Sequence, residues 1–211
     1  MNVNRQAVRS ATTRAKLIRA ARPLFARRGY AAVGTEEIVR RAGVTRGALY
    51  HQFPAKEDLF LAVYEQVEQE LTQRIGELLG AVESPLEAMR QGVRVFLEAC
   101  KTQEVQRIVL IDGPAVLGWE RWREVADANG LGLLEAVVAA AIEAGEIVEV
   151  PVGPLAHVLM GALDEAALLV VRDPQAMGPV IETFERLIEG LRAEPATRTA
   201  AKRPPSRRAR R

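Results

Sequence analysis

Apolar residues recur every three or four positions along most of this chain, which is the spacing of one face of an α-helix. The first such run predicts a helix over residues 13–28, with Thr12 or Thr13 as its N-cap and Gly29 as its stop signal. Its apolar face consists of Leu17, Ala21, Leu24 and Phe25. No run alternates with the two-residue period of a strand, so we expect an all-α protein.

Two short helices are predicted next, and a tight turn separates them. The first covers residues 35–42, opens at Thr35 and ends before Gly43. The second covers residues 46–52 and takes its N-cap from Thr45. Two short helices joined by three or four residues that include a glycine form a helix-turn-helix, whose second helix enters the major groove of DNA.

A longer helix is predicted to begin near Lys56, and helical patterns continue from it to about residue 192. Its apolar stripe consists of Phe60, Val63, Val67, Leu71, Ile75 and Leu78. The later helices are separated by turn signals at Ser84–Pro85, Asp112–Gly113–Pro114, Gly145, Gly153–Pro154 and Asp173–Pro174. We therefore divide the chain into a flexible N-terminal arm (1–12), a helix-turn-helix domain (13–60), a helical body (61–192) and a disordered basic tail (193–211).

Charge is distributed unevenly along the chain, although the formal net charge is only +2. Residues 1–63 contain 12 basic and 4 acidic residues, which gives this segment a net charge of +8. Residues 64–192 contain 10 basic and 22 acidic residues, and residues 193–211 contain 7 and 1. A basic head on an acidic body suits a protein that presents one part to a polyanion, with chance surface charge as the alternative interpretation.

The composition is that of a globular protein, because 48% hydrophobic and 27% charged residues exclude a collagen-like or low-complexity chain. A single cysteine, Cys100, excludes an internal disulfide and indicates a reducing compartment. The first residues are polar and basic, and the apolar runs are shorter than a membrane span. We expect a cytoplasmic protein that does not enter a membrane.

Residues 35–59, TEEIVRRAGVTRGALYHQFPAKEDL, resemble the DNA-binding segment of the TetR/AcrR family of bacterial transcriptional regulators. The resemblance is carried by Thr35, Ile38, Ala42–Gly43–Val44, Thr45, Gly47, Leu49–Tyr50, Phe53 and Lys56–Glu57. Val39 departs from the more frequent Ala, and Ala55 replaces the usual polar helix cap. The resemblance is strong over residues 13–64, and it implies a three-helix DNA-binding domain followed by a helical ligand-binding and dimerisation domain. It implies neither a cofactor nor a metal.

Seven residues are candidates for contact with a double-stranded DNA operator, namely Thr35, Thr45, Arg46, Gly47, Tyr50, His51 and Lys56. Arg46 is the first choice for a base contact because a guanidinium donates two hydrogen bonds to guanine, and a phosphate contact is the alternative. The resemblance implies that the glycine lets the backbone approach DNA closely and that Tyr50 and His51 lie against phosphates. Thr35 and Lys56 begin helices, where free N–H groups attract phosphate, although the lysine equally fits a solvated charge.

The last two predicted helices, near residues 154–172 and 175–192, carry more apolar surface than one neighbouring helix covers. Two such hairpins that meet about a twofold axis form a four-helix bundle, so we expect a homodimer, with packing inside one subunit as the alternative. The candidate contacts for a small-molecule effector are Met89, Phe96, Asp112, Trp119, Trp122 and His157. Each of these residues also fits a simple core position.

The resemblance implies a repressor that leaves its operator when a small, largely apolar effector binds. A transcriptional activator and a ligand-independent regulator share every DNA-binding residue and stay open as alternatives. An enzyme built on Asp112, His157, Asp164 and Glu165 is disfavoured because the chain has no HExxH, P-loop or GxSxG motif. A nonspecific DNA binder is a further alternative, in which the basic tail would supply most of the affinity.

Overall fold

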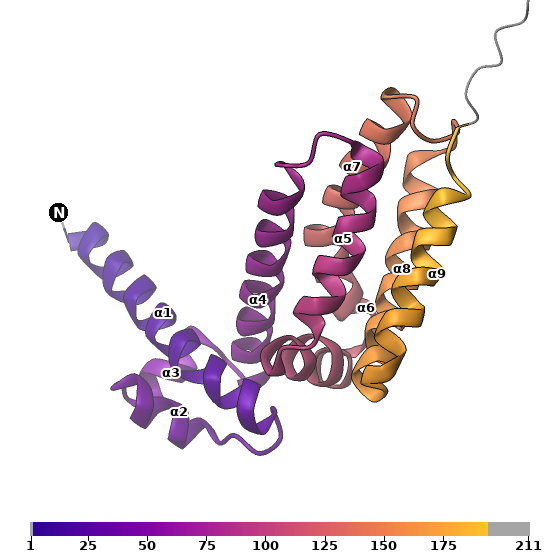
Figure 1. Cartoon of the computed structure of the whole chain (residues 1–211). Helices are drawn as coiled ribbons and strands as arrows, with labels where there is room; N and C mark the ends of the chain where they lie inside the picture. The colour runs from indigo at the N-terminus through magenta and orange to yellow at the C-terminus, as the bar shows by residue number, and fades with distance from the viewer. Residues whose placement is uncertain (1, 194–211) are drawn as a thin grey trace, which may run out of the picture.

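The computed structural model describes residues 2–193, and its regular elements in that range are helices (Figure 1). The N-terminal unit consists of α1 (Asn2–Arg28), α2 (Thr35–Ala42) and α3 (Arg46–Gln52). Between residues 2 and 193 no strand forms, and one isolated bridge joins Ile147 to Arg192. The predicted all-α fold with an N-terminal helix-turn-helix is therefore confirmed.

An apolar core holds the N-terminal helices together and joins them to the next helix. Its fully buried side chains include Leu17, Phe25, Val33, Ile38, Leu49, Leu59 and Phe60. The rings of Phe25 and Phe60 contact edge to face, with their centroids 5.4 Å apart. The predicted helix stops are also present, because Gly29 and Gly43 have φ angles of 77° and 64°, a region that glycine enters without strain.

Helix α1 begins at Asn2, so residues 2–12 are helical where the sequence predicts a flexible arm. The physical reason is that neither glycine nor proline interrupts residues 2–22, and nothing stops the helix from extending toward the N-terminus. Thr12 and Thr13 consequently do not cap the helix. Their hydroxyls donate to backbone carbonyls four residues earlier, at 2.8 and 3.0 Å.

Helix α4 (Lys56–Leu79) leaves the N-terminal unit and enters the C-terminal bundle (Figure 1). It begins at the predicted residue although Ala55 has no capping side chain, because the Asp58 carboxylate accepts a hydrogen bond from the Ala55 N–H at 2.8 Å. The predicted apolar stripe is correct up to its last member. Leu78 is exposed, and Leu79 is buried in its place.

The C-terminal domain is a helical bundle in which α5 packs against α4, α7, α8 and α9. Its elements are α5 (Pro85–Cys100), η1 (Val105–Asp112), α6 (Gly113–Ala126), η2 (Asp127–Leu131), α7 (Gly132–Glu143), α8 (Val152–Arg172), η3 (Pro174–Ala176) and α9 (Met177–Glu189). The segments η1 and η2 are π-helical, and each runs directly into the α-helix that follows it. The predicted basic tail lies outside the described residues from residue 194 onward.

The predicted turn at residues 112–114 does not form, because the chain stays helical there. Pro114 lies in the first turn of α6, directly after the π-helical segment η1. The interruption comes later, at Gly118, whose φ of 74° and ψ of 163° are not helical. This kink divides α6 into two parts and changes the relative directions of the side chains on either side of it.

Two segments reach the length and mean hydropathy of a membrane span, contrary to the expectation that all apolar runs are too short. They are Val105–Glu143 and Val152–Arg172, each with a window of mean hydropathy 1.6. The kink at Gly118 interrupts the first, and Asp164 and Glu165 lie near the middle of the second, where a bilayer penalises charge. Core helices of a bundle meet the same criteria, so these segments are weak evidence for a membrane protein.

Candidate DNA-binding surface and effector cavity

Helix α3 is fixed by its N-cap and by its buried face. The Thr45 hydroxyl accepts a hydrogen bond from the Ala48 N–H at 3.1 Å, as the sequence predicts. Leu49 and Phe53 are buried in the apolar core, where α3 packs against α1 and α2. At the end of the helix, Gln52 Nε2 donates to Ser10 Oγ at 2.8 Å, so the extended part of α1 also holds α3 in place.

The opposite side of α3 is exposed and carries the predicted DNA contacts Arg46, Gly47, Tyr50 and His51. The Arg46 side chain is 65% exposed and pairs only loosely with Glu36, at 3.8 Å. Its guanidinium lies 5.6 Å from the centre of the Tyr50 ring. Hydrogen bonding with Thr35 and Arg46 lowers the pKa of the Tyr50 hydroxyl. This side of α3 therefore presents hydrogen-bond donors and positive charge to solvent.

Nothing in the protein itself requires a glycine at position 47. A Cβ added at Gly47 would meet no atom closer than Thr45 Oγ1, at 4.0 Å, and the residue does not have a positive φ. The space in front of Gly47 is solvent, so the absent side chain leaves the backbone open to an incoming molecule.

The two residues predicted at helix starts differ in their surroundings. Thr35 is the first residue of α2, and Gly34 rather than Thr35 is the N-cap. Lys56 is half-buried, and its ammonium donates to the carbonyl oxygens of Tyr30 and Val33 at 3.0 and 3.1 Å. Burial lowers the pKa of Lys56. Lys56 therefore connects the loop between α1 and α2 to α4, so its charge is not fully solvated.

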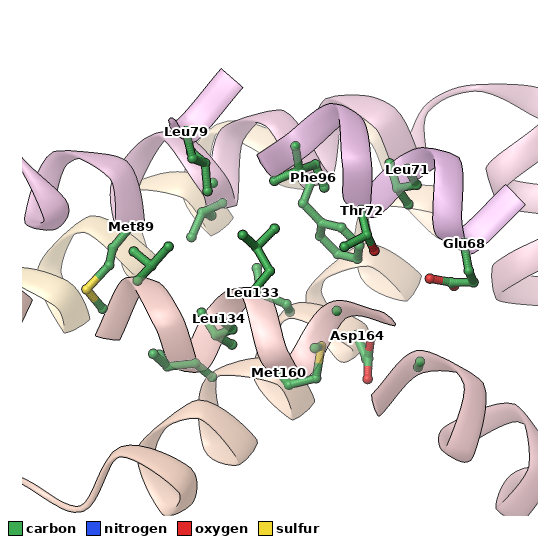
Figure 2. A pocket seen from close by; sticks show the side chains of 18 of the residues that line it. Glu68, Leu71, Thr72, Leu79, Met89, Phe96, Leu133, Leu134, Met160 and Asp164 are labelled. Atoms are coloured by element: carbon green, nitrogen blue, oxygen red, sulfur yellow. The ribbon is translucent and has the colours of Figure 1, made fainter. Parts of the chain in front are cut away.

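A second candidate site is a cavity of about 110 Å³ inside the C-terminal bundle (Figure 2). Its wall is almost entirely apolar and comes from α4 to α9. Residues that line it include Leu71, Ile75, Leu79, Met89, Val93, Phe96, Val109, Leu110, Trp122, Leu133, Leu134, Val137, Leu159, Met160, Leu163, Phe184 and Ile188. A mostly apolar cleft or cavity with a few polar groups is the usual form of a small-molecule site.

Three of the six predicted effector contacts line this cavity, namely Met89, Phe96 and Trp122. Asp112, Trp119 and His157 do not line this cavity, and their role as effector contacts stays a prediction. Trp119 is 66% exposed, although its ring centroid lies 5.0 Å from that of Trp122. His157 is exposed on α8 and contacts the carbonyl oxygen of Gly153 at 3.2 Å.

Asp112 connects the two domains. Its carboxylate accepts a hydrogen bond from the backbone N–H of Tyr30 at 2.6 Å, and Arg107 Nε lies 3.4 Å from the same oxygen. A second polar connection starts from Arg22 of α1, which pairs with Glu70 on α4 and with Glu104 just before η1. The N-terminal unit is thus joined to the bundle by ion pairs and hydrogen bonds as well as by α4.

The two acidic residues that line the cavity, Glu68 and Asp164, were not among the predicted effector contacts. Glu68 lies on the apolar stripe of α4, and Asp164 lies on α8, where Arg123 Nη1 pairs with its carboxylate at 2.5 Å. Burial raises the pKa of Glu68 to about 7 and that of Asp164 to about 6. A charged residue within an apolar stripe is the sequence signal that identifies such a position.

The outer face of α8 and α9 exposes large apolar side chains. Val158, Leu169 and Leu187 are 68%, 42% and 54% exposed. These residues belong to the two helices for which the sequence predicts a dimer interface. Packing of the whole apolar surface within one subunit, the alternative interpretation, does not occur, because these three side chains remain uncovered.

Two family models match the chain, and together they span most of it. Residues 17–63 match the model for bacterial regulatory proteins of the tetR family, and residues 86–191 match the model of a tetracyclin repressor-like C-terminal domain. The second match alone covers half of the chain.

Similarity to solved structures and to curated proteins indicates the same family. A crystal structure of a TetR-family transcriptional regulator from Pectobacterium atrosepticum has a TM-score of 0.80 and 31% identity, and covers 89% of this chain and 98% of that one. The transposon Tn10 TetC protein of Escherichia coli is 28% identical over 69% of this chain and 74% of its own length. The HTH-type transcriptional regulator LmrA of Bacillus subtilis is 30% identical over 43% of this chain and 47% of its own length. The chain spans about half the length, or less, of the first curated relatives that it matches.

Proposed function

The chain belongs to the TetR family of bacterial regulatory proteins, and on that premise we propose that it is a homodimeric, ligand-responsive transcriptional regulator. It binds a DNA operator through α3 and leaves the operator when a small effector occupies the cavity of the C-terminal domain. The single observation that carries the proposal is the exposed side of α3, where Arg46, Gly47 and Tyr50 face solvent. The proposed function includes no enzymatic reaction. The protein acts in the cytoplasm, where its operator lies.

The proposal gives five residues a part in DNA contact. Arg46 donates to the edge of a guanine, since its guanidinium is exposed and pairs only with an exposed carboxylate. Tyr50 and His51 donate to phosphates, and Gly47 allows the backbone of α3 to approach the groove. Thr35 contacts a phosphate from the start of α2. Lys56 positions the loop between α1 and α2 and does not serve as a main phosphate contact, because its ammonium is already hydrogen-bonded.

A twofold dimer through α8 and α9 explains the exposed apolar residues on these helices. Two copies of the helix pair form a four-helix bundle, which covers Val158, Leu169 and Leu187. The dimer presents two α3 helices to a pseudo-palindromic operator, about one helical turn or somewhat more apart.

Effector binding changes DNA affinity by a population shift between two dimer arrangements. The cavity is lined by α4, which continues into the DNA-binding unit, and by α8, which belongs to the proposed dimer interface. A molecule that fits the cavity better in one arrangement favours that arrangement and alters the distance between the two α3 helices. Release on binding makes the protein a repressor, and tighter DNA binding makes it an activator.

Selection from a library of random DNA duplexes tests the proposal. We expect the full-length protein to enrich a pseudo-palindromic sequence, and an effector screen against the protein bound to that sequence to yield compounds that change its affinity. A library that stays random after repeated rounds contradicts specific recognition. Ligands that fill the cavity tightly but leave DNA affinity unchanged contradict the regulatory coupling.

A further inference from the structure

A buried carboxyl without a matching partner lies at one end of the cavity. The Glu68 side chain is only 8% exposed and lines the cavity from α4. The Tyr64 hydroxyl lies beside it, but this hydroxyl donates its proton to the carbonyl oxygen of Trp122 at 3.1 Å. Among residues 7–193 no cationic side chain pairs with Glu68. A carboxylate taken out of water in this way needs a partner or a proton.

The same end of the cavity has more negative than positive charge. Asp164 pairs with Arg123 Nη1 at 2.5 Å, and Arg123 Nε lies 3.1 Å from Asp127 Oδ1. Asp127 Oδ1 is buried and has no hydrogen bond of good geometry. One guanidinium is therefore shared by Asp164 and Asp127, and the Glu68 carboxyl adds a third acidic group nearby. Buried charges are stable when they are paired, so this site favours a further cation.

The cavity has a polar end and an apolar end. Figure 2 shows Glu68 and Asp164 at one end and Met89 at the other, with Phe96, Leu133 and Leu134 between them. A ligand that satisfies both ends has one polar head and an apolar body.

We propose that the cavity binds a small apolar amine, whose protonated nitrogen lies between Glu68 and Asp164 and whose hydrocarbon body lies against Leu71, Phe96 and Met160. That this amine acts as the effector rests on the proposed regulatory function, whereas the binding of the amine to the cavity does not. The nitrogen links α4 to α8, and so links the helix that enters the DNA-binding unit to the helix at the proposed dimer interface.

The size and the donor set of the site restrict the ligand further. The cavity of about 110 Å³ is smaller than the apolar protein cavity of about 150 Å³ that accepts benzene, and it is partly open, so its ligand is limited to about one aromatic ring that extends into the opening. In the described part of the chain, no three His, Cys, Asp or Glu side chains are arranged to hold a metal ion. An organic cation therefore fits this end of the cavity better than a metal ion does.

Calorimetric titration of the full-length protein, without DNA, tests the proposal with three ligands of nearly equal size. Benzylamine is cationic at neutral pH, benzyl alcohol is neutral and benzoate is anionic. We expect benzylamine to bind at least about tenfold more tightly than benzyl alcohol and benzoate not to bind. In Glu68→Gln the difference between the amine and the alcohol should fall to about twofold or less. Glu65→Gln, the same change at an exposed position of α4, should leave it unchanged.

Equal binding of benzylamine and benzyl alcohol by the unmodified protein overturns the proposal, and this comparison needs no variant. An unchanged preference in Glu68→Gln overturns it as well, provided that circular dichroism shows an intact fold. The test is independent of the regulatory function. If the amine binds but no DNA sequence is enriched, the proposed regulatory function fails and the assignment of the cavity stands. If a DNA sequence is enriched but benzylamine has no preference over benzyl alcohol, only the amine proposal is rejected.

Discussion

The Asp112 carboxylate accepts a hydrogen bond from the backbone N–H of Tyr30 at 2.6 Å, and this contact joins the end of η1 to the loop after α1. The contact is well shielded, since Asp112 is a buried residue. Arg107 approaches the same carboxylate at 3.4 Å and packs over Gly29, where a Cβ would lie 2.2 Å from its guanidinium. The loop that positions the helix-turn-helix is therefore held from the C-terminal domain.

Loss of the Asp112 carboxylate should destabilise the protein. In Asp112→Ala the Tyr30 N–H loses its acceptor and the Arg107 guanidinium loses its ion-pair partner, at a cost of about 1–3 kcal/mol in the free energy of unfolding. Asp112→Asn retains one acceptor oxygen and should lose less. Urea unfolding followed by circular dichroism measures both values, and equal stability of Asp112→Ala and the unmodified protein would refute a role for this contact.

The stability of the protein should depend on pH through Glu68. Burial raises its pKa from 4.5 to about 7, so the folded state binds a proton that the unfolded state releases between these values. The stabilisation from this proton is complete below about pH 4.5 and is lost as the pH rises through 7.

Glu68→Gln removes this titration, so the variant should lose less stability than the unmodified protein between about pH 5 and pH 8. The expected difference is up to about 3 kcal/mol. Asp164, whose pKa is raised to about 6, has a similar effect in both proteins, and the comparison between them isolates Glu68. Urea midpoints at the two pH values give the result, and parallel losses in both proteins speak against a buried, uncompensated carboxyl.

The two tryptophans of α6 should differ strongly in their contribution to stability. Trp122 is buried, and its Nε1 donates to the Val109 carbonyl at 3.1 Å, so Trp122→Ala should cost about 3–5 kcal/mol. Trp119 is 66% exposed, and Trp119→Ala should change stability by about 0.5 kcal/mol or less. Thermal and urea unfolding compare the variants. Similar losses for both would mean that Trp119 is covered in solution.

The proposed dimer depends on apolar contacts of α8 and α9. The double variant Val158→Asp, Leu187→Asp places two charges in that surface and should convert the dimer to a monomer in sedimentation equilibrium. Leu78→Asp is the matched control, because this residue is 47% exposed but lies on α4. A double variant that remains dimeric would locate the interface on another face.

The N-terminal unit could be predicted almost completely because its signals are local. Gly43 ends α2 with a left-handed φ, Thr45 caps α3 through its hydroxyl, and Leu49 and Phe53 are spaced to face the core. Each of these features depends on neighbours within a few residues. The extension of α1 to Asn2 was missed because residues 2–12 have no apolar periodicity, although they contain no residue that breaks a helix.

The effector cavity could be predicted only in part because it depends on contacts between distant helices. Trp119 and Trp122 are three residues apart on the part of α6 that follows Gly118, and their ring centroids lie 5.0 Å apart, but only Trp122 is buried and lines the cavity. Asp112 and His157 were chosen for their chemistry, and neither faces the cavity. Glu68 was overlooked, although its place between Tyr64 and Leu71 on the buried side of α4 is visible in the sequence.

Fluorescence anisotropy tests most directly whether α3 recognises a specific DNA sequence. A labelled duplex from the upstream region of the gene is compared with a scrambled duplex across a series of salt concentrations. We expect at least about a hundredfold preference for the native duplex, since specific binding exceeds nonspecific binding by about 10³ or more in most such proteins. Arg46→Ala should weaken native binding by about 5- to 150-fold, whereas Arg74→Ala, an equal change of charge on the exposed side of α4, should not. Specific recognition by α3 would be contradicted if the two duplexes bind with equal affinity, if both affinities fall together as salt rises, and if Arg46→Ala leaves them unchanged.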